Sequence, residues 1–147
     1  MPKYITFIRH AQSIFNSGEE TNPALLINCP LSNFGIEQSK KLNLHFDILI
    51  MSPLKRAIQT YANSNIKTKE IIISPYIREQ IRGESTWLDF ENNLPYESID
   101  DMRKRIKYAM NNIYSLKHEN IGVISHGDFL RELFLVEFKK NVHFTAV

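Results

Sequence analysis

Short apolar runs separated by longer amphipathic or polar stretches make up most of the chain. The runs at 4–8, 46–51, 70–74 and 121–124 are rich in β-branched and aromatic residues. Runs of this length and composition, ended by polar or turn-forming residues, are typical of buried strands. The pattern therefore predicts four strands spread along the chain.

Two helices are predicted from their start signals. Ser32 follows a Pro-Leu turn and is suited to the N-cap of a helix that runs through Leu44. Ser52 is suited to the N-cap of a second helix, with Pro53 at the first helical position, where its missing N–H is not needed. Each of these helices lies next to a predicted strand.

The second half of the chain shows the same alternation. Apolar residues at helical spacing predict a helix over 99–117 and another over 130–136, whereas 76–95 has no clear period and is predicted to be a loop with a short helix at most. Strands that alternate with helices predict an α/β layered fold with a largely parallel sheet. No repeat or flexible linker divides the chain, so residues 1–147 are predicted to form a single domain.

Polar side chains follow three of the predicted strands directly. Arg9 and His10 come after the first strand, the segment 52–56 after the second, and His126 after the fourth. In open parallel sheets, ligands bind beyond the carboxyl ends of the strands. The sequence therefore predicts that these three distant segments meet at one edge of the sheet.

Composition and charge exclude several classes of function. The 147 residues are 43% hydrophobic, which suits one globular domain, and a formal net charge of +2 without a basic block argues against a nucleic-acid binder. The single cysteine, Cys29, excludes an internal disulfide and a cysteine-based zinc cluster. No apolar run is long enough for a signal-peptide core or a membrane span. A soluble cytoplasmic protein without a membrane partner is expected, and its oligomeric state stays open.

A histidine beside an arginine at a strand end suits chemistry on phosphate. Neutral imidazole is a nucleophile that can form a phosphohistidine, and arginine presents fork-shaped, permanently charged donors to phosphoryl oxygens. Nearby arginines also disfavour protonation of His10. Taken singly, Arg9, His10, Arg56 and His126 are each as consistent with an ion pair, a helix surface or a turn. Their joint position at strand ends favours a phosphate site.

Five segments resemble, in order, the motifs of the histidine phosphatase superfamily, the phosphoglycerate mutase-like proteins. The first is Arg9-His10-Ala11-Gln12, which resembles an Arg-His-Gly-Glu motif with Ala and Gln in place of Gly and Glu. The others are Pro30 to Gln38, Ser52 to Thr60, Arg78-Glu79 with Gly83 downstream, and Ser125 to Asp128. The resemblance covers nearly the whole chain and implies a three-layer α/β/α sandwich with a mostly parallel central sheet.

The resemblance implies a role for each matching residue. His10 would be the phosphorylated nucleophile, and Glu79 would protonate the leaving oxygen and later activate water, a role that suits a carboxyl whose pKa is raised by burial. His126 would take part in catalysis and also in phosphate binding. The phosphate ligands would be Arg9, Arg56, His126 and Asn16. No cofactor is expected and no metal, since no carboxylate or cysteine lies at a metal-site spacing from His10 and His126.

Departures from the family pattern favour hydrolysis over transfer. After Glu79 the match to the family motif is weak, because Trp87 is present but lies further from Gly83 than in the family pattern. The chain also ends soon after His126, at Val147. A mutase must exclude water and hold a substrate carboxylate, for which Arg78, Arg82 and Arg103 to Arg105 are candidates without a clear pair. A metal-independent phosphatase of small phosphorylated metabolites is therefore predicted. Mutase-type transfer, a phosphohistidine-protein phosphatase and an inactive phosphate-binding relic remain as alternatives.

Overall fold

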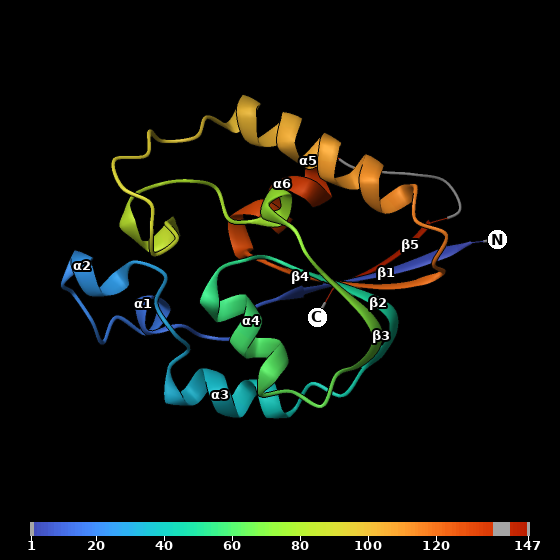
Figure 1. The fold of residues 1–147 in the computed structure, drawn as a ribbon, viewed down its shortest axis with the longest axis horizontal. Coiled ribbons are helices and arrows are strands. Elements are labelled where there is room, and N and C mark those ends of the chain that lie inside the picture. The colour runs from blue at the N-terminus through green and yellow to red at the C-terminus, as the bar shows by residue number, and fades with distance from the viewer. Residues whose placement is uncertain (1, 137–141, 147) are drawn as a thin grey trace.

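A computed structural model describes residues 2–136 and 142–146 of the chain (Figure 1). Five strands form one sheet in the order β3-β2-β4-β1-β5, and every neighbouring pair is parallel. The predicted, mostly parallel α/β architecture is therefore confirmed. The strands are β1 (Lys3–Arg9), β2 (His45–Met51), β3 (Lys67–Ile73), β4 (Asn120–Ser125) and β5 (Val142–Ala146).

Three of the four predicted strands lie where the apolar runs placed them, in β1, β2 and β4. The central strand β4 is buried from Ile121 to Ser125, because it is paired on both sides and covered on both faces. The third strand, β3, begins three residues before the predicted 70–74, at Lys67, and is half to fully exposed as an edge strand. The prediction missed β5 altogether.

Helices cover both faces of the sheet (Figure 1). On one face, α3 (Asn33–Lys40) and α4 (Lys55–Ala62) pack over a small core that includes Leu49 and Ile124. On the other, α5 (Ile99–Tyr114) and α6 (Gly127–Val136) pack over a larger core around Ile48 and Met110. The short elements are α1 (Ile14–Ser17), α2 (Pro23–Leu26) and the 3₁₀ turns η1 (Pro75–Ile77) and η2 (Glu84–Thr86).

The two predicted N-caps have different outcomes. Ser32 caps α3 through a hydrogen bond from Gly35 N to its Oγ at 3.0 Å, although α3 ends at Lys40 and not at Leu44. The prediction that Ser52 caps the next helix is wrong, because α4 begins at Lys55 and the backbone before it is extended. The Lys55 N–H is instead satisfied by the Asn28 side chain, whose Oδ1 lies 2.7 Å away.

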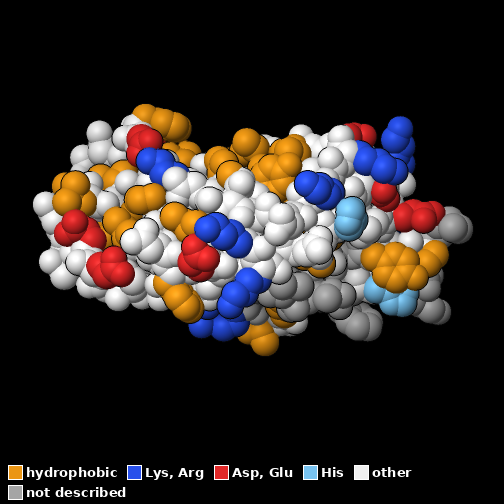
Figure 2. Space-filling model, turned by 90° about the horizontal axis from the view of Figure 1, so that it is seen from below, with side chains coloured by type: hydrophobic (Ala, Val, Ile, Leu, Met, Phe, Trp, Pro, Cys, Tyr) orange, Lys and Arg blue, Asp and Glu red, His pale blue; other side chains and the backbone are white. Residues whose placement is uncertain are grey.

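The surface matches the modest net charge. On the face shown in Figure 2, basic and acidic side chains lie in small separate groups among uncharged atoms. Among residues 2–136 and 142–146, no helix has the length and apolar character needed to cross a bilayer.

Candidate active site

Backbone hydrogen bonds bring three strand ends together at one edge of the sheet. His10 N donates to Ser125 O at 3.0 Å, and Ser52 N donates to Ile124 O at 3.1 Å, which continues the ladder one residue beyond the strands. The rings of His10 and His126 consequently meet edge to face, with their centroids 4.9 Å apart. The predicted convergence of these segments is confirmed as geometry.

His10 is held as a neutral imidazole whose lone pair is on Nε2. Its Nδ1 lies 2.6 Å from Ala11 O, and because a carbonyl only accepts, Nδ1 carries the proton. Nε2 then accepts from Arg56 Nε at 3.3 Å. Burial lowers the pKa of His10 to about 3, with further lowering by the charges of Arg56 and Arg9. The expected effect of the arginines on this pKa is present, but burial is the larger cause.

The loop that carries His10 is fixed by residues that the sequence analysis did not single out. Ala11 N donates to Thr60 Oγ1 on α4 at 2.9 Å. On the other side, the loop runs so close to α3 that a Cβ atom at Gly35 would lie 2.0 Å from Gln12 O. Only glycine permits this approach, so the Gly35 in the motif after Pro30 serves to support the histidine loop. In the sequence, the position of Gly35 within the Pro30 to Gln38 motif was the one indication of this contact.

Arg56 is a buried cation that makes no hydrogen bond to a carboxylate within residues 2–136 and 142–146. Its side chain leaves the first turn of α4, and the residue is only 4% exposed. Nε donates to His10 and Nη1 donates to Ser85 O at 2.8 Å, and Cys29 and Glu79 lie close enough to act on its pKa. Desolvation lowers the pKa of Arg56, which reflects the cost of burying this charge. An anion bound beside His10 would relieve that cost.

His126 lies behind His10 and is fully buried. Its Nε2 lies 2.7 Å from Ser52 Oγ, and its Nδ1 has no hydrogen-bond partner within the described chain. Burial, followed by the charge of Arg56, lowers its pKa well below the usual value, so the ring is neutral. Ser52 therefore positions this histidine instead of capping α4.

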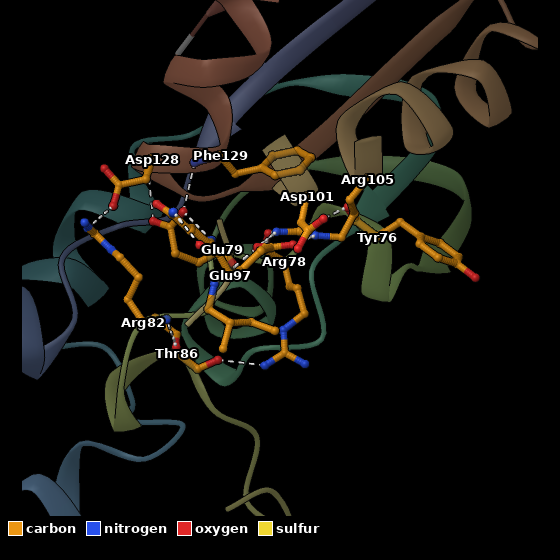
Figure 3. Close-up of polar contacts among 12 residues, drawn as sticks. Tyr76, Arg78, Glu79, Arg82, Thr86, Glu97, Asp101, Arg105, Asp128 and Phe129 are labelled. Atoms are coloured by element: carbon orange, nitrogen blue, oxygen red, sulfur yellow. Dashed lines mark hydrogen bonds and ion pairs between the residues drawn. The ribbon is translucent and has the colours of Figure 1, made fainter. Parts of the chain in front are cut away.

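Glu79 is partly buried against the N-terminus of α6. Its Oε1 accepts from Phe129 N at 2.8 Å and its Oε2 accepts from Asp128 N at 3.2 Å (Figure 3). Desolvation raises its pKa above the usual value, although the backbone hydrogen bonds from Gln80, Asp128 and Phe129 act in the opposite direction. The environment therefore favours a carboxyl that can hold a proton, as predicted.

A cavity of about 330 Å³ brings most of the predicted site residues together. Its wall includes five of them, namely Arg9, His10, Asn16, Arg56 and Glu79. It also includes residues that the sequence analysis did not assign to the site, namely Phe15, Ser85, Thr86, Tyr96, Gly127 and Asp128. His126 does not line it. A second cavity, of about 600 Å³, opens on the α3 side of Arg9 and His10.

Arg9 and Asn16 occupy the open side of the site. The Arg9 guanidinium lies against Gly127, where a Cβ atom would come within 3.2 Å of Arg9 Nε, so the glycine leaves room for it. Asn16 uses its Oδ1 to accept from Ser13 N and Ser13 Oγ at the start of α1. Asn16 is thereby fixed at the wall of both cavities.

The arginines proposed for a substrate carboxylate separate into different groups. Arg78 makes two hydrogen bonds to Glu91, and Arg105 makes two to Glu97, so both are occupied in buried ion pairs. Arg103 pairs with Glu132 away from the cavity. Of these candidates only Arg82 lines the cavity.

No group of three or more histidine, cysteine, aspartate or glutamate side chains within residues 2–136 and 142–146 is arranged to hold a metal ion. The positive charge next to His10 is supplied instead by Arg56 and Arg9.

Residues 5–140 match the histidine phosphatase superfamily (branch 1). Because this match spans most of the chain, the protein belongs to that superfamily, and the resemblance seen in the sequence is confirmed.

Relatives in these comparisons are named as phosphatases. The chain is 24% identical over 157 positions to "Putative phosphoserine phosphatase 2" of Hydrogenobacter thermophilus, covering 89% of this chain and 76% of the relative. A "putative alpha-ribazole-5'-P phosphatase" of Escherichia coli K-12 superposes with a TM-score of 0.65 at 21% identity, over 87% of this chain and 75% of that one. Phosphoserine phosphatase of Entamoeba histolytica, solved with 3-phosphoglyceric acid, gives 0.63 at 22% identity over 88% and 78%. These structures establish a shared fold.

Proposed function

We propose that the protein is a phosphatase that hydrolyses phosphate monoesters of small molecules through a phosphohistidine on His10, without a metal ion. The observation that carries the proposal is the buried Arg56 guanidinium, which makes no hydrogen bond to a carboxylate among the described residues and donates to Nε2 of a neutral histidine. Phosphoryl transfer depends chiefly on positioning and on stabilising the charge of the equatorial oxygens. A nucleophile with a fixed cation beside it meets both needs.

In the first step, His10 Nε2 attacks the phosphorus and the bond to the ester oxygen breaks. Arg56 and Arg9 bind the phosphoryl oxygens, with Asn16 Nδ2 as a further donor. Glu79 in its protonated form, which its raised pKa favours, gives its proton to the leaving alcohol. The products of this step are the free alcohol, a phosphohistidine and a Glu79 carboxylate.

In the second step, the same carboxylate takes a proton from water while the water oxygen attacks the phosphohistidine. The bond from phosphorus to Nε2 breaks, inorganic phosphate forms, and Glu79 is protonated again. For His126, which lies behind the cavity wall, we propose that the Ser52 hydroxyl donates to Nε2 and that Nδ1 donates to a phosphoryl oxygen once phosphate is bound at His10. The unpartnered Nδ1 supports this assignment.

The relatives named as phosphatases support hydrolysis over mutase-type transfer. Of the arginines considered for a substrate carboxylate, Arg78 and Arg105 are paired with Glu91 and Glu97, which leaves Arg82 as the one at the cavity. The complete set of His10, Arg56 and Glu79 around one cavity argues against an inactive relic.

The proposal is tested by steady-state hydrolysis of p-nitrophenyl phosphate in the presence of a chelator. We expect turnover in the native protein and none in His10→Ala, whereas His45→Ala, at an exposed histidine at the start of β2, retains it. Quenching during turnover with detergent at alkaline pH, which preserves the acid-labile phosphohistidine, should trap a phosphorylated native protein but no phosphorylated His10→Ala. A native protein that binds phosphate but hydrolyses no ester would refute the proposal, and turnover only on phosphohistidine protein would favour that alternative.

A further inference from the structure

One ion pair at the rim of the active-site cavity has no role in the chemistry described so far. Arg82 Nη2 donates to Asp128 Oδ2 across the cavity wall, and both residues line the cavity together with Glu79 (Figure 3). The pair joins the loop after Glu79 to the first turn of α6. It therefore brings one positive and one negative charge to the same side of the site.

The position of Arg82 is fixed by its own loop. Arg82 N donates to Thr86 Oγ1 at 2.9 Å, and Thr86 Oγ1 donates to Gly83 O at 2.7 Å. Gly83 adopts a φ of 77°, which lets the chain turn tightly between them. Thr86 O in turn accepts from the buried Arg78. A charged side chain on such an anchored turn is held in place without substrate.

Arg82 also keeps hydrogen-bonding capacity that the other arginines of this region have used. Its side chain is 52% exposed, and Asp128 is the sole partner of its guanidinium in the part of the chain that the structure describes. Arg78 and Arg105, in contrast, each bind a carboxylate through two nitrogens and also donate to backbone carbonyls. Arg82 can thus accept an additional anion.

The pair lies on the side of the leaving group. Asp128 N donates to Glu79 Oε2, the carboxyl proposed to protonate the leaving oxygen. Groups beside Glu79 therefore contact the alcohol part of the ester, whereas Arg56 and His10 contact the phosphoryl group. Arg131 donates to the other oxygen of Asp128 from outside the cavity, and so keeps that carboxylate oriented.

We propose that Arg82 and Asp128 select esters whose alcohol carries a carboxylate next to an ammonium group, that is, O-phosphorylated hydroxy-amino acids. The carboxylate accepts from Arg82 and the ammonium donates to Asp128, so each charge of the pair gains an opposite charge. A neutral alcohol would displace water from Arg82 and Asp128 without offering either an opposite charge, and this loss of hydration is unfavourable for binding. This inference rests on the proposed function, since the placement of the leaving group follows from Glu79.

The inference is tested by binding to His10→Ala protein, which cannot form the phosphohistidine, so binding is measured whether or not the native protein hydrolyses esters. Four phosphate esters of similar size separate the two charges: O-phospho-L-serine has both, 3-phosphoglycerate has only the carboxylate, phosphoethanolamine only the ammonium, and glycerol 3-phosphate neither. Calorimetry should show phosphoserine binding at least about tenfold more tightly than glycerol 3-phosphate, with the other two in between.

Variants in the same background assign the preference to its residues. We expect Arg82→Gln to remove the advantage given by the carboxylate and Asp128→Asn to remove the advantage given by the ammonium. Arg103→Gln is the matched control, because Arg103 is 50% exposed, pairs with Glu132 and does not line the cavity. Arg82→Lys keeps the positive charge but loses the paired N–H donors of the guanidinium, and it should retain part of the preference. This variant shows whether the loss in Arg82→Gln is due to a folding defect.

Equal affinity for the four esters would overturn the inference, as would a phosphoserine preference that survives in folded Arg82→Gln and Asp128→Asn proteins. Failure of the proposed function would give a different experimental result. In that case the native protein would not hydrolyse p-nitrophenyl phosphate, while the order of affinities in His10→Ala protein would be unaffected.

Discussion

Two buried arginines, one at the strand ends and one in the loop above them, show how different the two regions of the site are. Arg56 is 4% exposed and Arg78 is 8% exposed. The Arg78 guanidinium is matched by two oxygens of Glu91 at 2.8 and 2.9 Å and by Thr86 O. Within the described part of the chain, the hydrogen bonds of Arg56 go to a neutral ring nitrogen and a carbonyl, with Glu79 acting on it as a nearby charge.

The two regions differ in the partners that they provide for a buried charge. The loop from Arg78 to Glu97 has little regular structure, and ion pairs stabilise it in place of apolar contacts. At the strand ends, Arg56 has no hydrogen-bonded carboxylate among the described residues, which is unfavourable for folding and favourable for binding an anion. Burial of an arginine is thus not evidence of a site by itself; the nature of its partners distinguishes binding from structure.

The largest expected effect is on activity when the charge of Arg56 is removed. In Arg56→Gln we expect kcat/KM for p-nitrophenyl phosphate to fall by about 10²–10³-fold, as on the loss of one donor to a transition-state oxyanion. The melting temperature should stay the same or rise, because a buried charge without a hydrogen-bonded carboxylate among the described residues is lost. A large fall in melting temperature would show that Arg56 is structural and would remove the contrast with Arg78.

Removal of the proton donor should have the next largest effect, and it should depend on the leaving group. In Glu79→Gln we expect kcat to fall by about 10²-fold for alkyl phosphates and by much less for p-nitrophenyl phosphate, whose phenolate leaves without a proton. The native rate on alkyl esters should fall as the pH rises through the raised pKa of Glu79. An equal loss on both substrates would contradict the assigned role.

In the loop, the expected effect is on stability. Arg78→Gln leaves the partly buried Glu91 and the Thr86 carbonyl without their partner, and we expect the free energy of unfolding to fall by about 1–2 kcal/mol. The double variant with Glu91→Gln should recover part of this loss, because both charges are then absent. Urea unfolding of the two single variants and the double variant measures the coupling. Additive losses would show that the pair does not hold the loop.

The smallest effect is the dependence of stability on pH. The pKa of His10 is about 3 in the folded protein and about 6.5 in an unfolded chain, so the unfolded state binds more protons between these values. The contribution of His10 to stability is therefore complete above pH 6.5 and is lost as the pH falls towards 3. Glu79, with its raised pKa, acts oppositely: its contribution is present at low pH and is lost as the pH rises through its folded pKa.

Melting temperatures measured between pH 5 and 7.5 test this balance. We expect the native protein to lose stability on acidification, His10→Gln to lose less, and Glu79→Gln to lose more. His45→Gln serves as the control, because this residue is exposed and distant from the site. An unchanged slope in His10→Gln would show that His10 is not held neutral by its surroundings.

Local sequence pattern was sufficient for part of the fold and of the site. The strands β1, β2 and β4 were predictable because buried parallel strands are continuous apolar runs. His10 was predictable because it directly follows β1, and Arg56 because it lies in the segment that follows β2. The start of α4 was not predictable, because Asn28, from a segment distant in sequence, supplies the acceptor for Lys55 N. Ser52 was misassigned for the same reason, since its hydroxyl interacts with His126.

The sequence by itself determined which strands and motifs this chain contains, and hence its superfamily and its candidate nucleophile, because these depend on residues close together along the chain. Tertiary structure alone decided which charges are paired. Arg56, Arg78, Arg82 and Arg105 are chemically identical, and only the positions of Glu91, Glu97 and Asp128 make two of them structural and leave two at the cavity. The reason is physical: the energy of a buried charge depends on the neighbours that the fold places around it.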